Sequence, residues 1–266
     1  MNVLINLIIK TCLDTLYMTG MIIFVGFILG VLRKHSVENF QRSFGWNAVA
    51  ITAIIGVPIH EISHAILCVL FGHKITKLVL IQKRDESGVL GYVNHAYNPN
   101  NVYQQAGNFF IGVAPIFGGV SAIIALMYTI IPKTYNEFIS ISMNNLHITK
   151  ISYVALNAIL NSYIDLIKII FSFKNFTNPY FILFLFLAIC ISSHISLSSA
   201  DIKGASKGLF IIFFIILGIN ILGFSKFVMA ESILKYNIVL IGFLIVSLIF
   251  SSITYFVSLL LSLIKN

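Results

Sequence analysis

The sequence predicts an all-α polytopic membrane protein with about six transmembrane helices and a small β-hairpin between the second and third. Of its 266 residues, 58% are hydrophobic and only 10% are charged, and the mean hydropathy is +0.97. A soluble domain of this length is far more polar. Apolar stretches of about 20 residues, the length that crosses a bilayer, recur along the chain. No internal repeat divides them, so we expect residues 1–266 to form a single transmembrane domain.

Each expected span is an apolar stretch bounded by charged, polar or proline residues. The six stretches are 13–32, 46–71, 106–131, 180–199, 209–224 and 238–264. The first is expected to end at Arg33, where a basic cluster begins. The third is expected to stop at Pro132, because the residue before a proline disfavours helical backbone. The fourth follows Pro179 and is expected to end at Asp201.

Two connections between the spans are long enough to have structure of their own. Over 75–95, two runs rich in strand-forming residues flank a charged turn that ends in Gly88, which predicts a β-hairpin. Residues 133–178 mix Asn, Ser and Lys with apolar residues. Their middle part, 148–173, has mixed helical periodicity. We expect either an amphipathic helix at the membrane surface or an ordinary loop with a short helix.

Charge and cysteine content exclude several classes of function. The net charge of +8 is spread thinly and forms no block of Lys and Arg, so nucleic acid is not an expected partner and the lipid bilayer is. The three cysteines are scattered through apolar segments without paired spacing, which suggests neither a disulfide framework nor a thiolate zinc site. The low charge and abundant Ile, Asn and Lys favour a multi-pass protein of a bacterial cell membrane.

The second span contains the segment His60-Glu61-Ile62-Ser63-His64 in an otherwise apolar run. A charged residue near the centre of a span costs roughly 2.5–3.5 kcal/mol on insertion scales, so such groups face protein, water or a metal. His60 and His64 are four residues apart and share one helix face, as two ligands of one zinc ion do. Glu61 then occupies the position of the general base in zinc hydrolases.

A catalytic zinc ion usually has three protein ligands and a water. We expect Asp201 to be the third ligand, because it lies beside the end of a span among small, turn-forming residues. His194 precedes it by seven residues, which is two turns on the same face if the helix continues. It is an alternative ligand or a hydrogen-bonding partner of a ligand. His95, just after the hairpin, is a weaker candidate.

These features resemble the site-2 protease family of intramembrane zinc metallopeptidases. The similarity covers 46–204, which would be the catalytic core, and includes the His-Glu box, the hairpin, a later Asp and a Gly-rich third span. The stretch from Gly107 to Gly119 is similar to the family's small-residue motif after the hairpin. One departure is that the family has an Asp-Gly pair preceded by an Asn- and Pro-rich loop, whereas Ile-Lys-Gly follows Asp201 here.

The resemblance implies a metalloendopeptidase with one Zn²⁺ ion that cleaves a membrane-embedded or membrane-adjacent peptide. Glu61 would take a proton from the attacking water and pass it to the leaving amine. The hairpin would offer a strand edge on which an unwound substrate can pair. The residues expected at that edge are Val89, Leu90, Gly91 and Tyr92. Asn108 or Asn94 would stabilise the oxyanion.

Two other classes of function are compatible with the same motif. One is a non-enzymatic metal-binding membrane protein, such as a transporter or an inactive scaffold, which does not need a carboxylate beside the first ligand. The other is a di-iron membrane oxygenase, because the box also has the H-x-x-x-H spacing. That chemistry requires further histidine boxes, and the other histidines are dispersed. Three of them are expected in loops without a special role, namely His35, His73 and His147.

Overall fold

The protein is described here by a computed structural model, which covers residues 2–83, 88–144, 167–224 and 231–265, together with 157, 161, 164 and 165. Within these residues the chain is mostly helical, with one small antiparallel sheet, so the predicted fold class is confirmed. In chain order the elements are α1 (Asn2–Phe44), α2 (Trp46–Leu70), β1 (Lys74–Val79), β2 (Tyr92–Ala96), α3 (Val102–Ile130), α4 (Pro132–Asn144), α6 (Phe173–Phe176), α7 (Pro179–Ser192), α8 (Ser199–Ile221) and α10 (Glu231–Lys265).

Five helices in the described part of the chain are long and apolar enough to cross a membrane, namely α1, α2, α3, α8 and α10. The expected fourth span is only the 14-residue helix α7. At 1.5 Å per residue it is about 21 Å long, less than the roughly 30 Å hydrocarbon core of a bilayer. The expected fifth span is the continuation of α8, which begins ten residues earlier in the chain than the sequence suggested, at Ser199.

Helix α1 is much longer than the apolar stretch that predicted it. It continues through Arg33 to Phe44, so the expected helix end at Arg33 is wrong. The basic cluster bounds the apolar stretch, but Arg and Lys have high helix propensity and do not terminate a helix. The helix ends where Gly45 adopts a positive φ of 67°, a conformation that L residues rarely take. At 43 residues, α1 is about 65 Å long.

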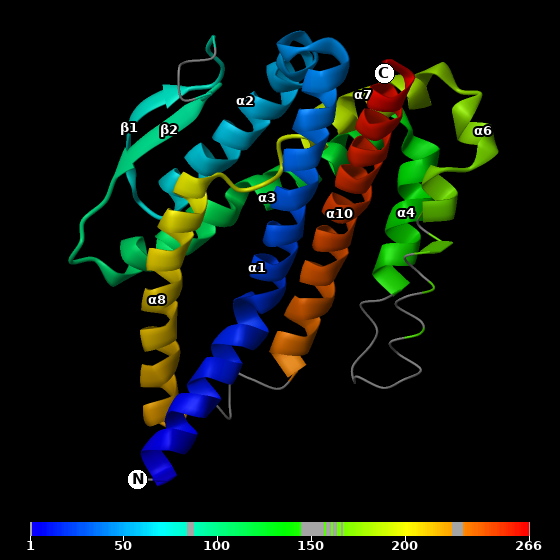
Figure 1. Ribbon diagram of the computed structural model, residues 1–266. Helices are drawn as coiled ribbons and strands as arrows, with labels where there is room; N and C mark the ends of the chain where they lie inside the picture. Colours follow the sequence, from blue (N-terminus) through cyan, green and yellow to red (C-terminus); the bar gives the residue numbers. More distant parts are fainter. Residues whose placement is uncertain are drawn as a thin grey trace.

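Helix α3 lies in the middle of the bundle, against α2, α7 and α8, while α1 and α10 run side by side (Figure 1). Its inward side chains Ile116, Val120, Ile123 and Met127 have no exposed surface. Polar side chains also join the outer helices, as where the Asn39 Nδ2 donates to Ser258 Oγ at 3.2 Å. Such interhelical hydrogen bonds hold apolar helices together in a membrane, where lipid competes for apolar contact.

The predicted hairpin is present and flanks α2 (Figure 1). Strands β1 and β2 pair antiparallel with Val79 opposite Tyr92, and the Gln82 backbone N–H extends the ladder by donating to the Leu90 carbonyl at 2.7 Å. In the region 133–178, the described elements are α4 and the short α6. The amphipathic segment expected over 148–173 lies mostly outside the described residues.

Candidate metal centre

The His-Glu box lies within α2, and its two imidazoles converge as the spacing predicts. The Nε2 atoms of His60 and His64 are 3.1 Å apart, and the ring centroids are separated by 4.8 Å. The four-residue spacing places both side chains on one helix face. Both rings are directed at the same point in space rather than at lipid.

Each ring is oriented by a backbone carbonyl from another part of the fold. His60 Nδ1–H donates to the carbonyl of His194 at 2.8 Å, and His64 Nδ1–H donates to the carbonyl of Ile111 at 2.7 Å. A carbonyl can only accept, so both protons are on Nδ1 and the neutral rings present Nε2 lone pairs to each other. Two lone pairs at this separation repel unless a proton or a metal ion lies between them. This arrangement is typical of metal-ligating histidines.

Asp201 completes the group from the first turn of α8. Its Oδ1 lies 3.1 Å from His64 Nε2, and its Oδ2 lies 3.5 Å from His60 Nε2. The residue therefore begins a helix, and the expected position at the end of the fourth span is wrong. Ser198 and Asp201 form a capping box, in which the Ser198 backbone N–H donates to Asp201 Oδ2 at 2.7 Å. The Ser-x-x-Asp spacing before an apolar run was the signal in the sequence for this helix start.

The three donor groups have the spacing that a zinc ion requires. Zinc–nitrogen and zinc–oxygen bonds of about 2.1 Å in tetrahedral geometry place neighbouring ligand atoms about 3.4 Å apart. The observed separations among His60, His64 and Asp201 range from 3.1 to 3.5 Å. Two imidazoles and one carboxylate are also a ligand set found in catalytic zinc sites. The residues present therefore fit the metal that the sequence predicts.

Glu61 and the three candidate ligands line one cavity of about 410 Å³. The Glu61 side chain is only 6% exposed, yet it borders this space. The wall is built by α1, α2, α3, the first turn of α8 and the chain from Gly88 to His95. A carboxylate beside a metal centre, facing a cavity, can accept a proton from a molecule bound there.

The other predicted site residues are Asn108 and Asn94, the four edge residues of the hairpin, His194 and His95. Asn108 and Asn94 line the cavity, as do the four expected edge residues from Val89 to Tyr92. Of these four edge residues, only Tyr92 belongs to β2. Val89, Leu90 and Gly91 form the segment that leads into the strand, which we call the arm. His194 also lines the cavity; its side chain contacts Thr52 Oγ1 through Nε2 at 3.3 Å, and its backbone carbonyl accepts from His60 Nδ1–H. Its expected place on a continuing helix is wrong, because α7 ends at Ser192.

His95 borders the cavity but does not belong to the group formed by His60, His64 and Asp201. Burial lowers the pKa of its imidazole below the ordinary value, and the nearby His73 and His64 lower it further. We therefore expect the His95 ring to be neutral at pH 7.

Arg33 is a site residue that the sequence reasoning missed. It lies within α1, lines the cavity and donates from Nη1 to Ser196 Oγ at 3.3 Å. Its charge interacts with Asp201 and Glu61, so it offsets part of the negative charge at the centre. The only signal in the sequence was a cation directly after an apolar stretch, which is equally typical of an ordinary span end.

Gly112 of α3 lets the first turn of α8 approach the metal ligands. A β-carbon at this position would lie 2.6 Å from the carbonyl oxygen of Asp201 and 2.8 Å from the β-carbon of Ala205. We predict that Gly112→Ala displaces Asp201 and lowers Zn²⁺ affinity about 10- to 100-fold, as loss of a supporting contact does at other metal sites. Competition with a chromophoric chelator measures this affinity.

The matched control for this prediction is Gly218→Ala. Gly218 lies in α8, and a β-carbon there would have no heavy atom within 4 Å apart from the neighbouring backbone of its own helix. The substitution removes a helical glycine without touching the site, and zinc affinity should be unchanged. Equal affinities for the two variants would show that the close approach at Gly112 does not position Asp201.

Comparisons of the chain with protein-family models, with curated proteins and with solved structures find no match in any of the three. The features that point to a function are therefore the residues of this chain and the geometry of the candidate centre.

Proposed function

We propose that the protein is an intramembrane zinc metalloprotease that hydrolyses a peptide bond in or near a membrane-spanning segment of its substrate. The observation that carries this proposal is the convergence of three ligand atoms, from His60, His64 and Asp201, in a cavity that Glu61 also lines. A general base beside a zinc-type ligand set is the combination that metal-assisted peptide hydrolysis uses. The three ligands lie in the helices α2 and α8, both of which are candidate membrane spans.

The chain's own residues have separate parts in this reaction. Bound to the three ligands, a zinc ion would lower the pKa of a coordinated water and polarise the scissile carbonyl. Glu61 accepts a proton from the attacking water as its oxygen bonds to the carbonyl carbon. The same carboxyl then donates that proton to the amine nitrogen as the carbon–nitrogen bond breaks. Asn108 and Arg33, which line the cavity, supply hydrogen-bond donors for the developing oxyanion.

The hairpin supports a peptide as the substrate. In the described residues, β2 pairs with β1 along one edge, and its residues from Tyr92 to His95 line the cavity. An extended peptide can add to a free edge through backbone hydrogen bonds. A β-carbon at Gly91 would lie 2.6 Å from a side-chain carbon of Val57, one turn before His60, so this glycine keeps the arm close to the ligands.

The substrate must expose its backbone at the centre, because a helix keeps its carbonyls in internal hydrogen bonds. Residues with low helix propensity, such as Gly, Pro and Asn, reduce the cost of unwinding by about 0.5–3 kcal/mol each. We therefore infer that the substrate is a membrane segment interrupted by such residues. The low charge and the abundance of Ile, Asn and Lys support a multi-pass protein of a bacterial membrane as the setting of this reaction.

The experiment uses the full chain in liposomes with two fluorescence-quenched single-span peptides. One peptide has an Asn-Gly pair within its apolar segment, and the other has Leu-Ala at the same place. We expect zinc-loaded protein to cleave the Asn-Gly peptide faster, a chelator to stop cleavage and added Zn²⁺ to restore it. Cleavage that persists without metal would overturn the proposal. Zinc bound at the centre with neither peptide cleaved would favour a non-enzymatic metal-binding protein.

A further inference from the structure

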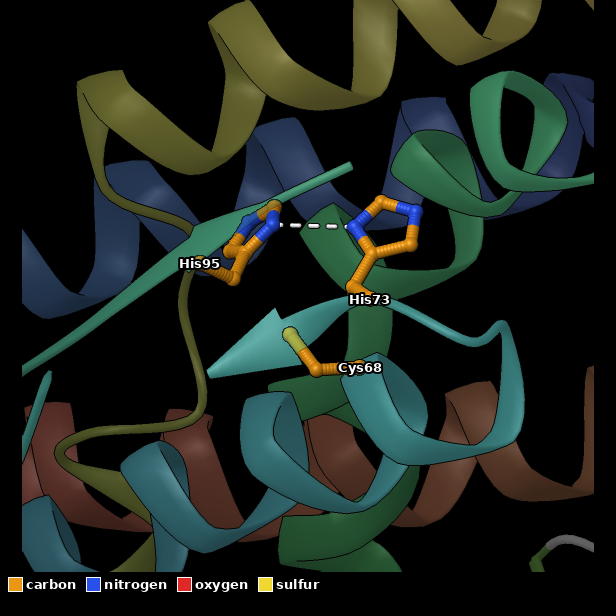
Figure 2. Close-up of side chains that lie close together, drawn as sticks. All are labelled: Cys68, His73 and His95. Atoms are coloured by element: carbon orange, nitrogen blue, oxygen red, sulfur yellow. Dashed lines mark hydrogen bonds between the residues drawn. The ribbon is translucent and has the colours of Figure 1, made fainter. Parts of the chain in front are cut away.

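A second group of metal-binding side chains lies next to the candidate centre. Cys68 is in α2, one helical turn beyond His64, while His73 follows the end of α2 and His95 is in β2. One ligand atom of each of the three lies within 4.8 Å of the others. Figure 2 shows the sulfur of Cys68 on the side of the helix that faces the two rings. Cys68 has no exposed surface, and His73 is 5% exposed.

The ring of His73 is held so that one nitrogen is available as a ligand. Its Nε2–H donates to the Gln104 carbonyl at 2.8 Å, which leaves a lone pair on Nδ1 in the neutral ring. That Nδ1 is 2.9 Å from His95 Nδ1 (Figure 2). Stacking against Tyr97, with ring centroids 5.0 Å apart, fixes the plane of the ring. A carbonyl thus orients His73 in the way that carbonyls orient His60 and His64.

A hydrogen bond between the two rings accounts for the imidazole pair alone. It does not account for the thiol of Cys68, which is brought to the same point from α2. One thiolate and two imidazoles are the donors that zinc, a cation of intermediate softness, prefers. Tetrahedral coordination would place the two nitrogens about 3.4 Å apart and each nitrogen about 3.6 Å from the sulfur. The two imidazole nitrogens lie 2.9 Å apart, and all three ligand atoms lie within 4.8 Å of one another, so a shift of about 1 Å of the thiol would complete this geometry.

We propose that Cys68, His73 and His95 form a second zinc site. It shares no ligand with His60, His64 and Asp201, and it binds metal independently of them. Its consequence is mechanical, because the ion joins the end of α2 to β2, the strand that lines the cavity. A two-stranded hairpin has little stability by itself. The second ion therefore fixes the hairpin edge relative to the ligands on α2. This proposal differs from the expectation, drawn from the sequence, that His73 has no special role and that no thiolate site is present.

Cobalt substitution distinguishes the two sites, since a thiolate bound to Co²⁺ gives an intense near-ultraviolet charge-transfer band. The first group has no sulfur ligand, so only the second site produces the band. We expect two Co²⁺ ions per full-length chain and the band in the wild type. The double variant His60→Ala/His64→Ala should keep one ion and the band. If the first centre binds no metal, the charge-transfer band of the second site can therefore still be measured.

Cys68→Ser should bind one ion and lose the band, whereas the control Cys12→Ser, at an exposed cysteine on α1, should keep both. His95→Gln provides a second variant, because its amide can still donate to His73 Nδ1 while it removes an imidazole ligand. We expect His95→Gln to fold, to bind one ion and to weaken the band. An absent band in the wild type, or a band retained by Cys68→Ser, would overturn the second site.

Discussion

Replacing Glu61 with glutamine is expected to abolish peptide hydrolysis while metal binding at the candidate centre stays intact. Glutamine has nearly the same size and shape as glutamate, so the cavity and the converging imidazoles on either side of it in the sequence should persist. It cannot accept a proton from water at neutral pH. General acid–base catalysis contributes about 10²–10⁴-fold to a rate, and we expect at least that loss.

Cleavage of the Asn-Gly peptide and zinc content, measured on the same preparation, check this prediction. The matched control is Glu38→Gln, which removes an exposed carboxylate on α1 that pairs with His35 at 3.4 Å. This control should keep both metal and activity. Full cleavage by the Glu61→Gln protein would refute the assigned base. Loss of zinc from that protein would indicate that Glu61 is a ligand.

Replacing Asp201 with asparagine is expected to remove the metal from the candidate centre and, with it, the activity. The amide lacks the negative charge that offsets the cation, and two neutral imidazoles alone bind zinc weakly. The remaining amide oxygen can still accept the Ser198 backbone N–H, so the start of α8 should be preserved. We expect zinc affinity at this centre to fall by at least about 100-fold, at the upper end of effects seen around metal sites.

Ser198→Ala separates this effect from the loss of a helix cap. Ser198 Oγ accepts from the Asp201 backbone N–H at 3.2 Å, and removing such a cap costs about 1 kcal/mol of stability. The variant should melt at a lower temperature yet keep its zinc, because the carboxylate is unchanged. Retention of the full metal complement by Asp201→Asn would mean that the Asp201 contacts are ion pairs with histidine and that the third ligand lies elsewhere.

The features that the sequence predicted well are those encoded by local pattern. Two histidines four residues apart share a face on any helix, so the convergence of His60 and His64 follows from the backbone period. Two runs of strand-forming residues around a charged turn that ends in Gly88 likewise predicted the hairpin. The wrong prediction that one span continues from 180 to Asp201 also has a local cause. An apolar stretch predicts one continuous helix, whereas the capping box at Ser198 starts a new one.

Hydropathy and spacing in the amino-acid sequence were by themselves enough to determine the membrane class, the histidine pair and the hairpin, because these depend on neighbours within a few residues. Only the tertiary structure decided that Arg33 reaches the cavity, that the carbonyls of Ile111 and His194 orient the imidazoles, and that Cys68 meets His73 and His95. These contacts join segments far apart in the chain. They depend on how closely α3, α8 and the hairpin pack against α2, which no local periodicity encodes.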